Sequence, residues 1–356
     1  MALIFLCLLL CSCLHFGPSQ LGDDQLGYTR ALSQSEKRQT LLNVVRIRYG
    51  DAPIFLDTTQ VISGYQWQRS VSGGLEAFPS GPPSTFLSGN ASAQLQETPT
   101  FTFQPVSGDH FAQSFLRPLD PADLLPLIHG GLPVDVVFRL AVQSVGSLRN
   151  SAGLQQHGGE GSPDFFVLLH NLRRLQIAGL IGVRIGKEAK PERGAQATAR
   201  PEGVFLTMTP TRDPALATVE AEVLRLLGIP PRTSEVEVVY GSTGQGPLQV
   251  AILTRSMLGV LGQLAFQIEA PTQDVARGWT VPSVGEVAVE RRPVIFVRSG
   301  AVPPDNPFVA IEYQHAWFWI DQDDFDSKLA FSVVNILLAL AKVSSAPGTV
   351  ITVPVR

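Results

Sequence analysis

The chain has 356 residues, of which 44% are hydrophobic and 16% are charged, and its formal net charge is −4. A hydrophobic fraction of this size predicts a folded protein with a substantial core and excludes a disordered chain. The mild acidity argues against general nucleic-acid binding, because that function needs a basic face.

The N-terminus has the features of a secretory leader. Ala2 to Cys11 is an unbroken apolar run, too short to cross a bilayer as a helix but suited to the core of a signal peptide, although no Lys or Arg precedes it. The run ends in Leu10-Cys11-Ser12-Cys13, which resembles the lipobox of bacterial lipoproteins. Residues 1–13 are therefore expected to form a signal peptide, with Cys13 as the lipidation site. Ordinary signal cleavage, an uncleaved short anchor and a cytoplasmic protein are the alternatives.

Cysteine usage limits the chemistry of the mature protein. No cysteine follows Cys13, so the rest of the chain has no disulfides, thiolate metal sites or cysteine nucleophiles. Leu14 stands where an aspartate would favour retention in the inner membrane, and by resemblance to Gram-negative sorting this predicts the outer membrane, facing the periplasm.

Residues 14–32 are expected to tether the lipid to a domain. A helix is predicted from Ser33 or Ser35 through Arg48, because apolar residues recur at helical spacing and Gly50 follows its end. Residues 52–71 are rich in β-branched and aromatic residues, which predicts strands, and residues 100–104 return to strand alternation. The Gly-, Ser- and Pro-rich segment 70–100 between them is expected to be a loop or a partly ordered hairpin.

The remaining chain alternates between helical and extended patterns. Residues 187–202 are expected to form a mobile loop, and Gly241–Gly246 a hairpin connection. Helices are predicted at 109–116, 121–128, 162–178, 214–227, 255–267 and 324–342, and strands at 180–185, 204–209, 235–240, 249–253, 294–298, 309–313, 317–320 and 349–353. Residues 134–145 are strongly apolar and fit either a helix or a strand, with a helix favoured.

This mixture predicts an α+β fold, with a mixed, mainly antiparallel sheet packed with several helices. Residues 33–356 are expected to form a single module, which could divide into subdomains at 33–148 and 162–356.

No complete catalytic motif is present. His129-Gly130-Gly131 is similar to the oxyanion loop of some esterases, but the chain lacks the Gly-x-Ser-x-Gly elbow that this chemistry needs. The acidic cluster Asp321, Asp323, Asp324 and Asp326 precedes a predicted helix, so helix capping is favoured over calcium binding. We therefore predict no catalytic residues, no metal site and no cofactor.

Two groups of residues are candidates for binding a partner. Trp317 and Trp319 share one face of a predicted strand, where they form either part of the core or an aromatic contact surface for a protein or glycan. Arg46, Arg48 and Asp57, with Asp51, crowd a helix–strand junction. These charges are expected to form an ion-pair network or a ligand site.

Three blocks of sequence resemble the signatures of a set of uncharacterised bacterial envelope proteins and lipoproteins. The blocks are Leu41–Asp57, Thr254–Gly259 and Trp317–Lys328. The resemblance implies a single family module without an established activity.

The sequence thus predicts a lipid-anchored envelope protein that binds an unknown envelope partner or supports an assembly, without catalysis. The alternative is a hydrolase-like enzyme of unfamiliar type, in which Asp and Arg residues of 46–57 and 321–326 would meet in a cleft.

Overall fold

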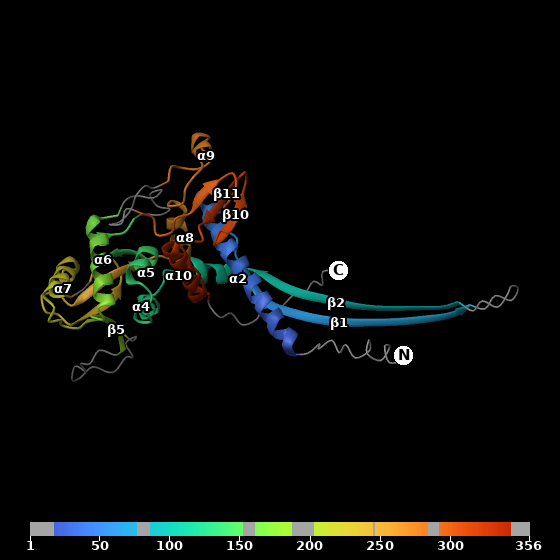
Figure 1. The fold of residues 1–356 in the computed structure, drawn as a ribbon. Helices are drawn as coiled ribbons and strands as arrows, with labels where there is room; N and C mark the ends of the chain where they lie inside the picture. Colours follow the sequence, from blue (N-terminus) through green and yellow to red (C-terminus); the bar gives the residue numbers. More distant parts are fainter. Residues whose placement is uncertain are drawn as a thin grey trace. The chain divides into compact units, whose positions relative to one another are not determined.

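The structure, a computed structural model, describes residues 18–76, 86–151, 161–186, 203–244, 246–283 and 292–342; at 18–24 and 57–103 it describes the backbone (Figure 1). The lipobox-like segment, the predicted mobile loop at 187–202 and the predicted strand at 349–353 lie outside the described residues. Two compact units are present, Met1–Pro53 with Phe111–Val343 and Ile54–His110 with Ser344–Arg356. Neither unit has a boundary near residue 150.

A six-stranded sheet forms one half of the larger unit, with the strand order β4-β3-β8-β7-β6-β5. Neighbouring strands are antiparallel except β7 and β8, which run parallel. The strands are β3 (Val142–Val145), β4 (Leu148–Arg149), β5 (Ile181–Gly186), β6 (Gly203–Met208), β7 (Glu235–Tyr240) and β8 (Gln249–Thr254).

Helices pack on this sheet and on each other. α4 contacts β5, β6 and β7, while α6 contacts β5, α5 and α7 (Figure 1). Val236 and Val238 of β7 are buried, whereas Glu235 and Glu237 are partly exposed. This period of two is expected when one face of a sheet is covered. The helices are α4 (Pro121–His129), α5 (Val134–Ala141), α6 (Pro163–Ile177) and α7 (Pro214–Leu227).

The other half of the larger unit contains a three-stranded antiparallel sheet of order β10-β11-β9, formed by β9 (Arg298–Gly300), β10 (Val309–Tyr313) and β11 (Ala316–Ile320). The helix α2 (Pro18–Arg48) packs against β10 and against α8 (Met257–Ala265), which also contacts α10 (Phe325–Ala341). The α2 helix begins at Pro18, so residues assigned to the tether continue the helix toward the N-terminus. Its C-terminal end is followed by Gly50 at φ 77°, as predicted.

The smaller unit contains a long antiparallel hairpin of β1 (Leu56–Glu76) and β2 (Phe86–Pro105). Of the two predictions for residues 70–100, the hairpin is confirmed and the loop is wrong, because the Gly- and Ser-rich residues pair across the ladder from Leu56↔Pro105 to Glu76↔Phe86. The short helix α3 (Gly108–Phe111) and the π-helix η1 (Ala112–Leu116) follow the hairpin in sequence.

The α+β class is confirmed, and three local predictions need correction. Residues 134–145 divide into α5 and β3. The predicted strand 294–298 is wrong except for its last residue: β9 begins at Arg298, and Val294, Ile295 and Val297 are buried outside the ladder. The predicted hairpin connection from Gly241 to Gly246 is wrong. The strands before and after this segment, β7 and β8, are parallel, whereas the two strands of a hairpin are antiparallel.

Candidate functional site

The strand β11 alternates strictly between buried and partly exposed residues. Ala316, Phe318 and Ile320 are buried, and Phe318 is opposite Ile311 of β10 in the covered face of the small sheet. Trp317 and Trp319 lie on the other face and remain partly exposed. The two tryptophans are therefore not buried in the core, which was one of the two interpretations of their spacing.

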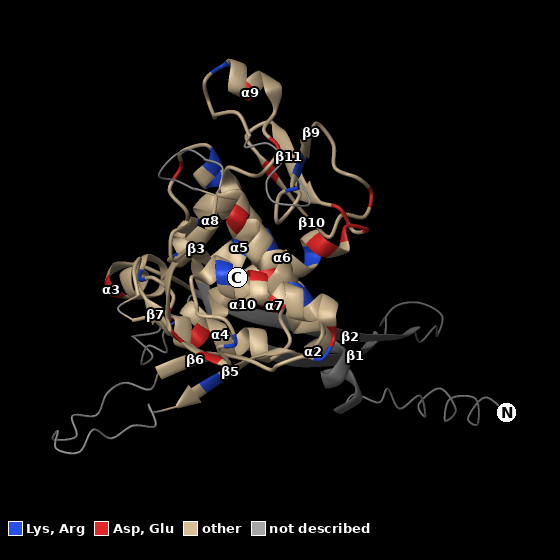
Figure 2. Ribbon diagram, turned by 90° about the vertical axis from the view of Figure 1, so that its left-hand side faces the viewer, with Lys and Arg blue, Asp and Glu red and all other residues tan. Residues whose placement is uncertain are grey.

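The partly exposed face carries charged groups beside the two indoles. Glu312 is opposite Trp317 and is exposed, while Arg298 is opposite Trp319 and is also exposed. We call the residues Arg298, Gly300, Ala310, Glu312, Trp317 and Trp319 the aromatic face. Charged residues of both signs surround the small sheet (Figure 2).

Trp319 is held in one position by its neighbours. Its Nε1 donates to Oδ1 of Asp321 at 2.9 Å, and the other oxygen of that carboxylate accepts from Arg298 Nε at 2.5 Å. Gly300 lies against the ring, since a Cβ added there would be 3.0 Å from Cη2 of Trp319. A ring packed over a glycine on a neighbouring strand is a recurrent means of stabilising a sheet, and it leaves this indole pre-ordered.

The acidic cluster caps a helix, which agrees with the favoured interpretation. Asp324 accepts from the backbone N–H of Ser327 at 3.1 Å, at the start of α10, and from the Ser327 hydroxyl at 2.7 Å. Arg292 donates to both carboxylate oxygens of Asp324 at 3.0 Å. Although burial alone raises the pKa of Asp324, these hydrogen bonds hold it below its ordinary value.

The charged residues Arg46, Arg48 and Asp51 at the helix–strand junction contact other groups and not one another. Arg46 Nε donates to the Ala52 carbonyl at 2.8 Å, whereas Asp51 accepts from the Tyr313 hydroxyl. Arg48 is buried and donates to the Val281 carbonyl at 2.6 Å. Asp57 belongs to the smaller unit, and its side chain is outside the description. The predicted ion-pair network is therefore not seen among Arg46, Arg48 and Asp51.

Arg48 lies in an unusual position for a cation. Its Nη2 also donates to Ser283 Oγ at 3.2 Å, but Nε and Nη1 are buried without a hydrogen-bond partner. The guanidinium lies over the ring of Phe266, with 5.6 Å between Cζ and the centroid. Burial lowers the pKa of Arg48 to about 10, so it stays charged at neutral pH.

A polar cluster that no sequence pattern marks lies next to this arginine. Asp274, in α9 (Thr272–Ala276), is fully buried and accepts from the Tyr49 hydroxyl at 2.5 Å through Oδ2. Its Oδ1 lies 2.9 Å from Nε2 of His315, which is exposed at the β10–β11 turn. Burial first, and then the hydrogen bond to Asp274, raise the pKa of Tyr49 well above its usual range. A carboxylate that orients an imidazole is also found in catalytic sites, but the contacts include no nucleophile.

The cluster joins distant parts of the chain, and its loss should reduce stability. We expect Tyr49→Phe to lower the free energy of unfolding by about 1.5–3 kcal/mol, because a buried carboxylate oxygen loses its donor. Urea unfolding would measure this, with Tyr240→Phe, at a side chain that is 53% exposed, as the matched control. Equal stability of the two variants would contradict the assignment of a stabilising role.

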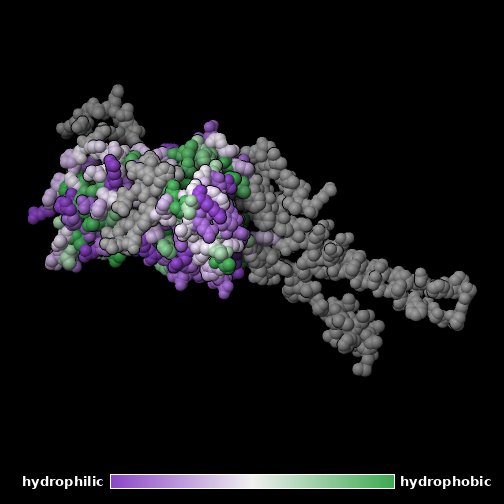
Figure 3. All heavy atoms as spheres, turned by 90° about the horizontal axis from the view of Figure 1, so that it is seen from above, coloured by the Kyte–Doolittle hydropathy of each residue, from purple (hydrophilic) through white to green (hydrophobic). Residues whose placement is uncertain are grey.

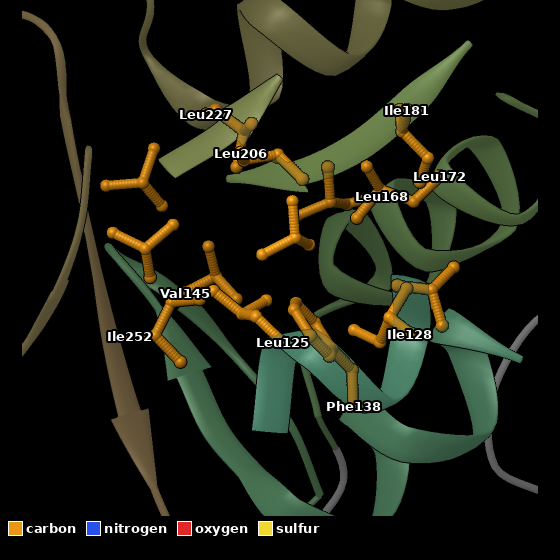
Figure 4. Close-up of a pocket in the computed structure, with 14 residues that line it drawn as sticks. Leu125, Ile128, Phe138, Val145, Leu168, Leu172, Ile181, Leu206, Leu227 and Ile252 are labelled. Atoms are coloured by element: carbon orange, nitrogen blue, oxygen red, sulfur yellow. The ribbon is translucent and has the colours of Figure 1, made fainter. Parts of the chain in front are cut away.

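A cavity lies between the six-stranded sheet and the helices α4, α5 and α6 (Figure 4). Its volume of about 20 Å³ holds little more than one water molecule. The lining side chains converge from both layers and all are apolar: Leu125, Ile128, Val134, Phe138, Val145, Leu168, Leu172, Ile181, Val183, Leu206, Leu227, Val238, Val250 and Ile252. This is a gap in a hydrophobic core with no group to orient a substrate.

Exposed hydrophobic residues elsewhere are scattered. Ile177, Val302 and Phe325, which are 72%, 76% and 68% exposed, belong to three different segments. In the view from above, hydrophobic and hydrophilic residues alternate in small patches over the described surface (Figure 3). Single exposed apolar residues need no functional explanation, so the aromatic face remains the candidate site.

Comparison with known proteins gives no assignment, because no family model, no curated protein and no solved structure matches the chain. Within the described residues, no three or more His, Cys, Asp or Glu side chains are grouped so that they could hold a metal ion. Among the helices that the structure describes, none combines the length and apolar composition that crossing a bilayer requires.

Proposed function

We propose that this protein is a lipid-anchored component of the cell envelope that binds a partner protein through its aromatic face, without catalysis. The alternation of burial along β11 carries the proposal, because it leaves Trp317 and Trp319 partly exposed while Phe318 fills the core. Tryptophan and arginine are the side chains that most often dominate the energy of protein interfaces.

The side-chain conformation of the aromatic face is already restricted, which favours binding. Trp319 is fixed by Asp321 and Gly300, so a partner would not have to restrict that side chain. Arg298 and Glu312 bring opposite charges to the rim, where they could set the orientation of a partner.

The proposed lipid anchor is inferred from the N-terminal signal peptide and its lipobox-like end. A diacylated or triacylated Cys13 would hold the protein at a membrane, since each buried methylene contributes about 0.8 kcal/mol. With Leu14 after it, the expected location is the outer membrane, with the folded units facing the periplasm. The partner is accordingly expected among envelope proteins.

The enzyme alternative has less support. It requires the Asp and Arg residues of 46–57 and 321–326 to share a cleft, but Asp321 and Asp324 are each engaged by an arginine within their own part of the fold. Arg48 is likewise buried against backbone and Ser283. These contacts are those of structural ion pairs and caps.

Site-directed photocrosslinking in intact cells tests the proposed binding. A photoreactive residue at Glu312, on the aromatic face, should form an adduct with an envelope protein. The same residue at Thr218, exposed on α7, should form none. Trp317→Ala combined with Trp319→Ala should reduce the adduct about tenfold or more, because such side chains each contribute over about 1 kcal/mol at an interface.

Trp279→Ala serves as the control for removal of a tryptophan, since Trp279 is 46% exposed and lies outside the aromatic face. An equal loss of adduct in this control would mean that the effect is not local. Adducts of equal yield at positions 312 and 218, or an adduct unaffected by the double substitution, would overturn the proposal.

A further inference from the structure

The aromatic face carries its two charged residues at opposite corners. Trp317 of the central strand β11 is opposite Glu312 of β10. Trp319, in the next row of the same face, is opposite Arg298 of β9. Because β10 and β9 pair with β11 on opposite sides, the negative and the positive residue are at diagonal corners, and the two indoles lie between them.

Both charged side chains have atoms available to a partner. Glu312 is exposed, and among the described residues its carboxylate has no hydrogen-bond or ion-pair partner. The side chain of Arg298 is 49% exposed, and it contacts Asp321 through Nε. A guanidinium has five N–H donors, so the four on Nη1 and Nη2 of Arg298 still point to no acceptor within the part of the chain that the structure describes.

Opposite charges at diagonal corners make this face complementary to itself. A two-fold axis that brings residue i of one copy to residue j of another also brings j to i. Two copies can meet face to face about an axis that lies between them and runs perpendicular to the line from Glu312 to Arg298. Each Glu312 then lies over the Arg298 of the other copy, and the four indoles meet between the two ion pairs.

We propose that the partner of the aromatic face is a second copy of this chain, joined face to face by two reciprocal Arg298–Glu312 pairs. The inference rests on the proposed function, because it names the partner of that same face. Trp317 and the restricted Trp319 supply most of the binding energy, as buried tryptophans do at interfaces. The charges at the corners set the orientation of the two copies and disfavour other partners.

The symmetry of the contact limits the assembly to a dimer. Because both copies use the same face, the interface is complete once two copies are joined, and no further copy is added. An unlike partner has to match both corners with charges of its own, whereas a second copy carries both at the matching separation. Under the proposed function, lipid anchors hold the copies in one membrane, which raises their effective concentration.

Two differently tagged copies of the full chain, expressed together in intact cells, test the proposal. A photoreactive residue at Ala310, opposite Trp319 on the aromatic face, should give an adduct of two copies that contains both tags. Arg298→Glu in both copies, or Glu312→Arg in both, places like charges over each other and should reduce this adduct at least about tenfold. Arg212→Glu, at an exposed arginine outside the aromatic face, should leave the adduct unchanged.

Co-expression of the two variants gives the most specific result. A copy with Arg298→Glu has two negative corners and a copy with Glu312→Arg has two positive ones, so the mixed pair should regain the adduct to within about twofold of wild type. Misfolded variants would not regain it, and a mixed pair without the adduct would overturn the proposal. An adduct with a different envelope protein, and none with both tags, would overturn it while supporting the proposed function. The absence of any adduct would overturn both.

Discussion

Arg255→Ala should lower the free energy of unfolding by about 4 kcal/mol or more. The Arg255 guanidinium is buried and donates to the carbonyls of Val142 and Ser151, each at 2.6 Å, and of Leu140 at 3.2 Å. These carbonyls belong to the end of α5, the first residue of β3 and the segment after β4, so one side chain joins three parts of the fold. Each buried acceptor left without a donor costs about 1–3 kcal/mol.

The position of Arg255 suits a cation despite its burial. It lies where the last carbonyls of α5 are free, at the negative end of the helix dipole. Burial lowers the pKa of Arg255 to about 9, so the group is still charged at neutral pH. Lysine should not replace it, because an ammonium group cannot reproduce the planar fork.

Urea unfolding measures the loss, with Arg225→Ala as the control. Arg225 forms a salt bridge with Glu222, one turn away on the exposed side of α7, and exposed pairs of this kind contribute little to stability. A loss in Arg255→Ala as small as that of the control would mean that the carbonyls find other donors.

Phe318→Ala should cost about 3–5 kcal/mol, the range for removing a fully buried aromatic side chain. Phe318 is 0% exposed, and its ring meets Tyr49 edge to face with 6.2 Å between centroids. Its removal would open a cavity between the small sheet and α2, so the end of α2 and the Tyr49–Asp274 hydrogen bond should loosen together.

Phe325→Ala is the control, since Phe325 is 68% exposed and its removal should change stability by no more than about 0.5 kcal/mol. Thermal and urea unfolding of both variants would test the alternation of β11. A Phe318→Ala protein as stable as wild type would contradict the burial on which the aromatic face depends.

Local signals in the sequence located many elements well. The helix α7 has the predicted limits, because Gly228 ends it in the left-handed conformation at φ 68°. Its start is fixed by Pro214 and by the cap from Asp213. The strand β7 has equally clear limits, since it alternates between two turn regions. Where such stop signals are missing, as between α5 and β3, an apolar run fits both structures and the boundary was missed.

The candidate site was only partly predictable. The spacing of Trp317 and Trp319 showed that they share a face, but which face is covered depends on α2, which lies far away in the sequence. The Tyr49–Asp274 hydrogen bond spans 225 residues, and no local pattern marks either residue. The same holds for Arg255, whose acceptors lie more than 100 positions away.

The proposed function places the protein at a membrane, and the intact mass of the mature protein extracted from membranes tests this most directly. The account predicts a mass that corresponds to cleavage before Cys13 plus covalently bound acyl chains, and a Cys13→Ala variant that lacks them. An unmodified mass with the leader still present would contradict the account and would return attention to a cytoplasmic protein.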